Sequence, residues 1–150
     1  MAFDFKKEYK EFYMPKNKPE IVTVPKANYI AVRGKGNPNE EGGEYKQAVG
    51  ILYAIAYTLK MSYKSDYKIE GFLEYVVPPL EGFWWQDGPF DDEPSTVAIM
   101  DKFLEENGYR NDFSAGRLHH EIYMSDARKI APCNWKTVIR HPICKLQGKG

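Results

Sequence analysis

The chain has 150 residues, and its 21 basic and 21 acidic side chains give a formal net charge of zero. A domain that binds nucleic acid normally carries a basic surface that neutralises phosphates, whereas here lysines alternate with acids, as in Lys6-Lys7-Glu8. Composition therefore argues against direct binding of nucleic acid. The length suits a single domain, residues 1–150, whose hydrophobic core needs neither a metal nor a disulfide.

The cysteines and the N-terminal residues bear on compartment and cofactors. Cys133 and Cys144 form no CxxC pair and have no histidine at zinc spacing. The first seven residues lack the apolar segment of a signal peptide, and no apolar run approaches the length of a membrane span. Gly34-Lys35-Gly36 lacks the remainder of a phosphate-binding loop. We therefore expect a cytoplasmic protein with no membrane partner, no metal and no cofactor.

The first half of the chain alternates extended and helical patterns. Residues 20–24 form a short extended piece between prolines, and residues 27–33 have the composition of a strand. Residues 44–60 predict a helix, because apolar side chains recur there at i, i+3 and i+4. Residues 72–77 and 80–85 are then predicted to be the two strands of a hairpin.

The second half predicts a further helix and two strands. The helix begins at residues 93–96, since proline is tolerated only in the first turn, and it ends before Asn107-Gly108. Residues 118–124 and 135–143 are the predicted strands. This order indicates an α+β fold, an antiparallel sheet with helices on one face. It also suggests two pseudo-repeated βαββ units, the second shortened by the loss of its first strand.

Glu121 is the strongest single candidate for chemistry. Strand alternation places it on one face with His119 and Tyr123, while its neighbours point the other way. If that face closes over a cleft, burial would raise the pKa of the carboxyl and a nearby cation would lower it, which suits a general base or a counter-charge. The alternative is an open sheet face with Glu121 in water. Glu74 occupies the equivalent place in the first unit, with the same two interpretations.

Aromatic residues make up 15% of the chain, and eleven of them are tyrosines. Such an excess suits a packed core, and it equally suits the wall of a pocket that grips flat ligands. Trp84 and Trp85 must point to opposite faces of a strand, so one is available to line a cavity, although the register is not fixed by sequence. Tyr53 and Tyr57, on the second face of the first helix, are candidates for further stacking walls.

Several motifs, taken in order, resemble the GyrI-like small-molecule-binding family. The matching segments span most of the chain: Pro25-Lys26-Ala27-Asn28-Tyr29, Gly34-Lys35-Gly36-Asn37-Pro38-Asn39, Glu70-Gly71-Phe72, Pro79-Leu80-Glu81-Gly82-Phe83-Trp84, Gly88-Pro89-Phe90-Asp91-Asp92-Glu93-Pro94, His120-Glu121-Ile122-Tyr123-Met124-Ser125-Asp126 and Lys136-Thr137-Val138-Ile139-Arg140-His141-Pro142. The combination is specific, although no single segment is.

The resemblance implies a cradle of two βαββ units whose central cleft takes flat cationic or lipophilic ligands, with Glu121 projecting into it beside aromatic residues. Relatives include ligand domains of multidrug-responsive regulators, proteins that protect DNA gyrase, and stand-alone hydrolases of cyclopropane-bearing DNA-alkylating toxins. In those enzymes a glutamate and aromatic residues position and activate water. The resemblance thus implies that the protein binds a small aromatic molecule. It further implies that the protein hydrolyses such a molecule and so protects the cell against xenobiotics. Glu121 would be the base and Tyr123 a hydrogen-bond donor.

The chain departs from the family pattern in one place. Family members usually carry a long stretch between the segment that here ends at Trp84 and the segment that here begins at Gly88. This chain lacks that stretch, so it has an apparent internal deletion. A sheet edge exposed by that loss would pair with a second chain, so a homodimer is one expectation.

Two other functions fit the same sequence. A protein-interaction module that sequesters a partner such as a DNA topoisomerase would present a flat surface with no ligand preference. A shortened cradle that folds and dimerises without a ligand site is the second alternative.

Overall fold

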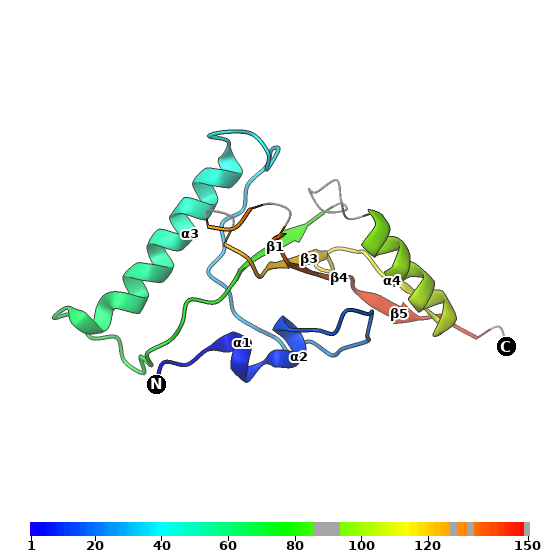
Figure 1. Ribbon diagram of the computed structural model, residues 1–150, viewed down its shortest axis with the longest axis horizontal. Helices are drawn as coiled ribbons and strands as arrows, with labels where there is room; N and C mark the ends of the chain where they lie inside the picture. Colours follow the sequence, from blue (N-terminus) through cyan, green and yellow to red (C-terminus); the bar gives the residue numbers. More distant parts are fainter. Residues whose placement is uncertain (86–93, 127–128, 132–133, 149–150) are drawn as a thin grey trace. The chain divides into compact units, whose positions relative to one another are not determined.

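The computed structural model describes residues 1–85, 94–126, 129–131 and 134–148 (Figure 1). Cys133 and the Gly88–Glu93 part of the motifs lie outside the described residues. The chain divides into two compact units, the first made of residues 1–12 and 22–78 and the second of residues 13–21 and 79–150. The single domain expected from length stays a prediction.

The first unit is built around one long helix. Helix α3 (Glu44–Met61) continues into the 3₁₀ turn η1 (Ser62–Lys64), which confirms the helix predicted over residues 44–60. Two short helices, α1 (Phe5–Glu8) and α2 (Lys10–Tyr13), begin the chain. Asp4 caps α1 by accepting a hydrogen bond from the backbone N–H of Lys6 at 3.1 Å.

Two strands predicted in the first unit are not formed. Residues 27–33 have no strand assignment, and residues 72–77 contribute only an isolated parallel bridge between Tyr75 and Phe3. The physical reason is that β-rich composition yields a strand only where a partner supplies ladder hydrogen bonds. Among the described residues only Phe3 does so, donating to Glu74 and accepting from Val76, both at 2.8 Å. The Tyr75 hydroxyl donates to the carbonyl of Ala56 in α3 at 3.1 Å, and burial raises the pKa of this tyrosine.

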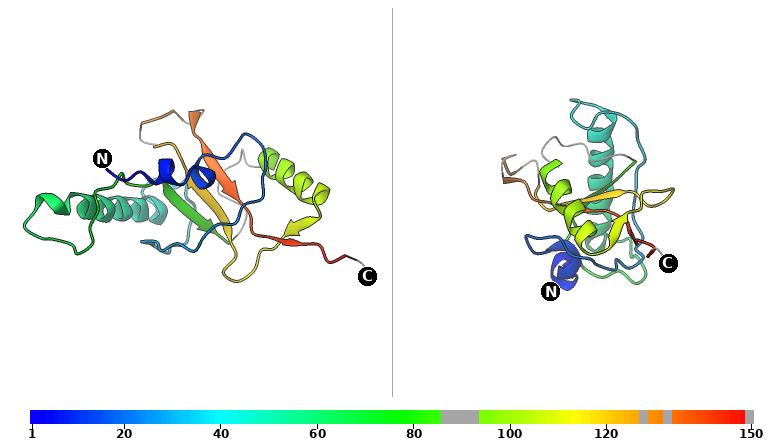
Figure 2. Two further views of the ribbon diagram at one scale, coloured as in Figure 1. Left: turned by 90° about the horizontal axis from the view of Figure 1, so that it is seen from below. Right: turned by 90° about the vertical axis from the view of Figure 1, so that its right-hand side faces the viewer.

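The second unit holds the sheets. Strands β1 (Leu80–Trp84), β3 (His119–Tyr123) and β4 (Thr137–Arg140) form an antiparallel sheet in the order β1-β3-β4, and Figure 2 shows their green, yellow and orange arrows side by side. Strands β2 (Tyr109–Asn111) and β5 (Ile143–Lys145) form a second antiparallel pair, on which helix α4 (Pro94–Glu106) packs through β2. The α+β fold with an antiparallel sheet is therefore confirmed.

The strand pairing differs from the sequence-based prediction in two respects. Strand β1 pairs with β3 and is not the second strand of a hairpin with residues 72–77. The strand predicted over residues 135–143 is divided into β4 and β5, which join different sheets, and Pro142 between them has no N–H to continue a ladder. The two βαββ pseudo-repeats are accordingly not visible within the described residues.

Helix α4 ends as its sequence predicts. Gly108 follows it with a φ of 74°, the left-handed conformation that closes many helices and that glycine adopts at little cost. The side-chain amide of Asn107 donates to the carbonyl of Phe103 at 2.7 Å, which satisfies one of the carbonyls left over at the helix end.

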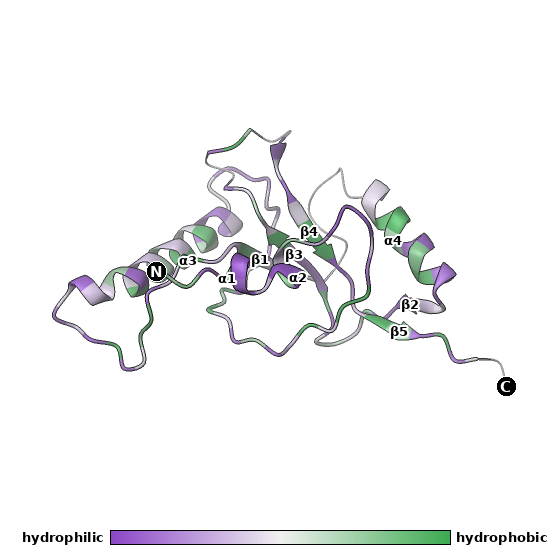
Figure 3. Ribbon diagram, turned by 60° about the horizontal axis from the view of Figure 1, so that its bottom comes forward, coloured by the Kyte–Doolittle hydropathy of each residue, from purple (hydrophilic) through white to green (hydrophobic). Residues whose placement is uncertain are grey.

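The most buried side chains gather on the central strand β3. Ile122 is 0% exposed, and His119, His120 and Glu121 on the same strand are also buried. Figure 3 colours β3 among the hydrophilic segments, although the strand lies in the interior of its unit. Buried polar side chains need hydrogen-bond partners. The polar side chains of β3 and the partners they contact therefore form the candidate site.

None of the helices in the described parts of the chain combines the length and the apolar character that crossing a membrane requires.

Candidate functional site

The alternation of β3 creates one polar face. His119, Glu121 and Tyr123 share this face, as their spacing predicts. The antiparallel register places two residues of β1 opposite them, Gly82 facing Glu121 and Trp84 facing His119. Side chains of neighbouring strands on one face lie within contact distance, so this part of the sheet collects a carboxylate, an imidazole, a phenol and an indole.

Glu121 is held at both carboxyl oxygens. Its side chain is 0% exposed. Oε1 lies 2.8 Å from Nε2 of His119, and Oε2 accepts a short hydrogen bond from the Tyr123 hydroxyl. Burying a carboxylate is costly unless donors replace water, and these two groups are such donors.

The contacts continue in both directions from Glu121. The indole Nε1 of Trp84 donates to the Tyr123 oxygen at 3.2 Å. On the other side, Nδ1 of His119 lies 2.9 Å from Nε2 of His141, the residue that follows β4. We call these five residues the carboxylate network. His141 has no predicted role in the sequence, because its contact with His119 depends on the β3–β4 pairing.

Gly82 leaves the space that the network occupies. A Cβ atom on this residue would lie 2.7 Å from Nε1 of Trp84 and 2.9 Å from the Tyr123 oxygen, closer than non-bonded atoms approach. Glycine is therefore required here for lack of room, and not for an unusual backbone angle.

Replacing Gly82 by alanine is expected to destabilise the second unit by about 1–3 kcal/mol, because the added methyl group displaces Trp84 and Tyr123. Denaturant unfolding of the two proteins measures the difference. The matched control is Gly50→Ala in α3, where a Cβ meets nothing within 4 Å, and where helix propensity predicts a gain of about 0.5–1 kcal/mol. Equal changes in the stability of the two variants would contradict the crowding.

A second glutamate–histidine pair lies on the opposite face of the sheet. Oε2 of Glu81 is 2.7 Å from Nε2 of His120, and Oε1 accepts from the Tyr13 hydroxyl at 3.1 Å. The ring of Phe83 stacks on His120, with centroids 4.1 Å apart and planes 9° apart. The adjacent histidines thus face opposite ways, as predicted. No three His, Cys, Asp or Glu side chains in the described ranges converge as metal ligands.

Neither a protein-family model nor a curated protein sequence matches the chain. Solved structures do. Two hydrolases from Listeria innocua are 38% and 36% identical, with TM-scores of 0.85 and 0.84 over 95% and 96% of this chain and 100% of theirs. An uncharacterized conserved protein from Listeria innocua is 37% identical, with a TM-score of 0.85 over 95% of this chain and 100% of its own. The chain belongs to the same family as these proteins.

Within this family member, four of the predicted site residues come together: Glu121, His119, Tyr123 and Trp84. Of the two tryptophans, Trp84 shares the face of Glu121, while Trp85 is 72% exposed. The sequence left this open because it does not fix the strand register.

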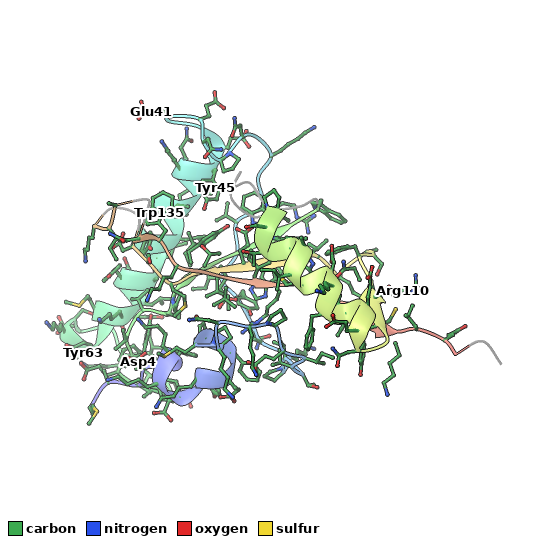
Figure 4. The ribbon with its side chains drawn as sticks, turned by 45° about the vertical axis from the view of Figure 1, so that its right-hand side comes forward. Asp4, Glu41, Tyr45, Tyr63, Arg110 and Trp135 are labelled. Atoms are coloured by element: carbon green, nitrogen blue, oxygen red, sulfur yellow. The ribbon has the colours of Figure 1, made fainter. Side chains whose placement is uncertain are left out.

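Three further residues that the sequence predicts to bind a ligand, Tyr53, Tyr57 and Glu74, belong to the first unit. Tyr53 and Tyr57 lie on α3, with ring centroids 6.4 Å apart, and Glu74 is exposed. Figure 4 labels Tyr45 near the start of this helix and Tyr63 just beyond its end. The ligand-binding roles of Tyr53, Tyr57, Glu74 and Trp85 stay predictions.

Proposed function

We propose that this chain is a GyrI-like hydrolase that adds water to small, flat aromatic electrophiles, with cyclopropane-bearing compounds as its substrate class. The observation that carries the proposal is the buried Glu121 carboxylate, held between His119 and Tyr123. Two relatives described as hydrolases support it, as do the GyrI-like motifs of the sequence. A protective role against such compounds in the cytoplasm follows from the same proposal.

Glu121 acts as a base through Tyr123, whose phenol relays the proton. Glu121 is 0% exposed, whereas Tyr123 is half-buried, so the phenol is the part of the pair that reaches a ligand. The attacking water gives a proton to the Tyr123 oxygen while the phenol proton passes to Oε2 of Glu121. General base catalysis of this kind needs a hydrogen-bonded path, which the short contact between the two side chains provides.

The bonding changes amount to the addition of one water molecule. The water oxygen forms a bond to a cyclopropane carbon, and the strained carbon–carbon bond breaks. Its electron pair moves into the conjugated aromatic system. That system takes up the proton returned from Glu121 through Tyr123, so the protein regains its starting state and no oxidant or reductant is needed.

Trp84 supports this arrangement in two ways. Its indole N–H donates to the Tyr123 oxygen, which orients the phenol. Its ring, half-buried in the structure, offers a surface for stacking a flat ligand, a contact that contributes about 0.5–1.5 kcal/mol beyond area burial.

Ligand binding is tested by thermal unfolding with flat aromatic compounds, cationic and neutral, on the wild type and on Glu121→Gln. A ligand at a hundred times its dissociation constant adds about 2.7 kcal/mol of stability, which raises the Tm by several degrees at this size. A shift with cations that the variant loses indicates that the negative charge of Glu121 contributes to cation binding. If no compound shifts the Tm, the proposal fails, and the chain is better explained as a protein-interaction module.

A further inference from the structure

His119 uses both of its ring nitrogens in the carboxylate network. Nε2 lies 2.8 Å from Oε1 of Glu121, and Nδ1 lies 2.9 Å from Nε2 of His141. A neutral imidazole has one nitrogen that donates and one that accepts. In neutral His119 the direction of one hydrogen bond therefore fixes the direction of the other.

Glu121 sets that direction. An ionised carboxylate only accepts hydrogen bonds, so the single N–H of His119 lies at Nε2. Nδ1 is then an acceptor, and the proton in its contact with His141 belongs to His141. The His119 side chain is 1% exposed, so both of its ring nitrogens depend on neighbouring side chains for hydrogen bonds.

We propose that His141 is a positioning residue for Glu121: by donating from Nε2 to His119 Nδ1, it keeps the His119 ring neutral and commits its N–H to the carboxylate. A doubly protonated His119 would instead place a cation against Glu121 and make it a weaker base. The positioning role rests on the proposed function, whereas the hydrogen-bond direction is a property of the resting protein and can be measured without a substrate.

The fold holds His141 in place for this role. It follows β4, whose register sets Ile139 opposite Glu121, and it precedes Pro142, which fixes the backbone before β5. Its ring also meets Phe113 edge-on, with centroids 5.0 Å apart and planes 70° apart. The donor therefore approaches His119 from a constrained position.

Long-range ¹H–¹⁵N NMR of the imidazole rings tests the direction. The chain has three histidines, so single His→Gln variants assign every ring signal. We expect His119 to be protonated at Nε2 alone, with His141 protonated at the nitrogen that faces it. A His119 ring protonated at both nitrogens, or at Nδ1 alone, would overturn the proposal in the wild-type protein itself.

Two variants of His141 test its role in turnover. His141→Phe keeps a ring against Phe113 but cannot donate, whereas His141→Gln keeps a side-chain N–H. We expect His141→Phe to lower kcat by about 10- to 100-fold with little change in KM, as when a supporting hydrogen-bond partner is lost. His141→Gln should recover most of that loss. The His119 Nδ1 signal should move toward that of an unbonded nitrogen in His141→Phe and stay in place in His141→Gln.

A third variant separates donation from packing. Phe113→Leu removes the ring contact of His141 and leaves its donor, so the His119 signals should not change. Equal effects of Phe113→Leu and His141→Phe on kcat would overturn the positioning role. A wild-type protein with the expected ring protonation but no turnover of any electrophile would support the hydrogen-bond direction and refute the proposed hydrolase function alone.

Discussion

Replacing Glu121 by glutamine is expected to lower turnover of a cyclopropane-bearing electrophile by about 10²- to 10⁴-fold, the range that general acid–base catalysis supplies. The substitution keeps the shape of a side chain that is 0% exposed and removes its capacity to take a proton. Binding of a neutral ligand should change little, because the phenol and the indole remain. Single-turnover rates with saturating enzyme separate the chemical step from binding.

The control for this variant lies on the other face of the same sheet. Glu81 also meets a histidine and a tyrosine, at 2.7 Å and 3.1 Å, but belongs to a separate cluster. Glu81→Gln should therefore perturb the sheet to a similar degree and retain turnover. Equal losses in the two variants would assign the effect to packing. An unchanged rate in Glu121→Gln would remove this carboxylate from the mechanism.

Replacing Ile122 by alanine is expected to destabilise the second unit by about 2–5 kcal/mol, because a fully buried aliphatic side chain is lost and a cavity remains. Ile99→Ala in α4 is the matched control, since that side chain is 59% exposed and its truncation should change stability by no more than about 0.5 kcal/mol. Denaturant unfolding followed by tryptophan fluorescence measures both. A small loss at Ile122 would show that β3 is not the centre of the core.

The elements that sequence reasoning predicts correctly are those whose signal is local. Helices α3 and α4 follow from apolar spacing, and the end of α4 follows from Gly108, whose φ of 74° suits no other residue as well. The strands predicted over residues 27–33 and 72–77 failed because a strand depends on a partner elsewhere in the chain, which composition does not supply.

In the candidate site, too, the sequence predicts the features that depend on local structure and misses those that depend on strand pairing. His119, Glu121 and Tyr123 were predicted to share a face because strand alternation is local, and they do. The contacts made by His141 and Glu81 arise from the pairing of β3 with β4 and β1, which the sequence does not specify. The burial of Glu121 was one of two open alternatives, and the fold decides it, since β3 is the central strand of its sheet.

The most direct test of the account is the product formed from a cyclopropane-bearing aromatic electrophile in ¹⁸O-labelled water. We predict that the wild-type protein yields a ring-opened alcohol that carries ¹⁸O, whereas Glu121→Gln yields none above the uncatalysed background. Recovery of unchanged compound from a protein whose Tm the compound raises would contradict the hydrolase proposal and leave a ligand-binding protein in its place.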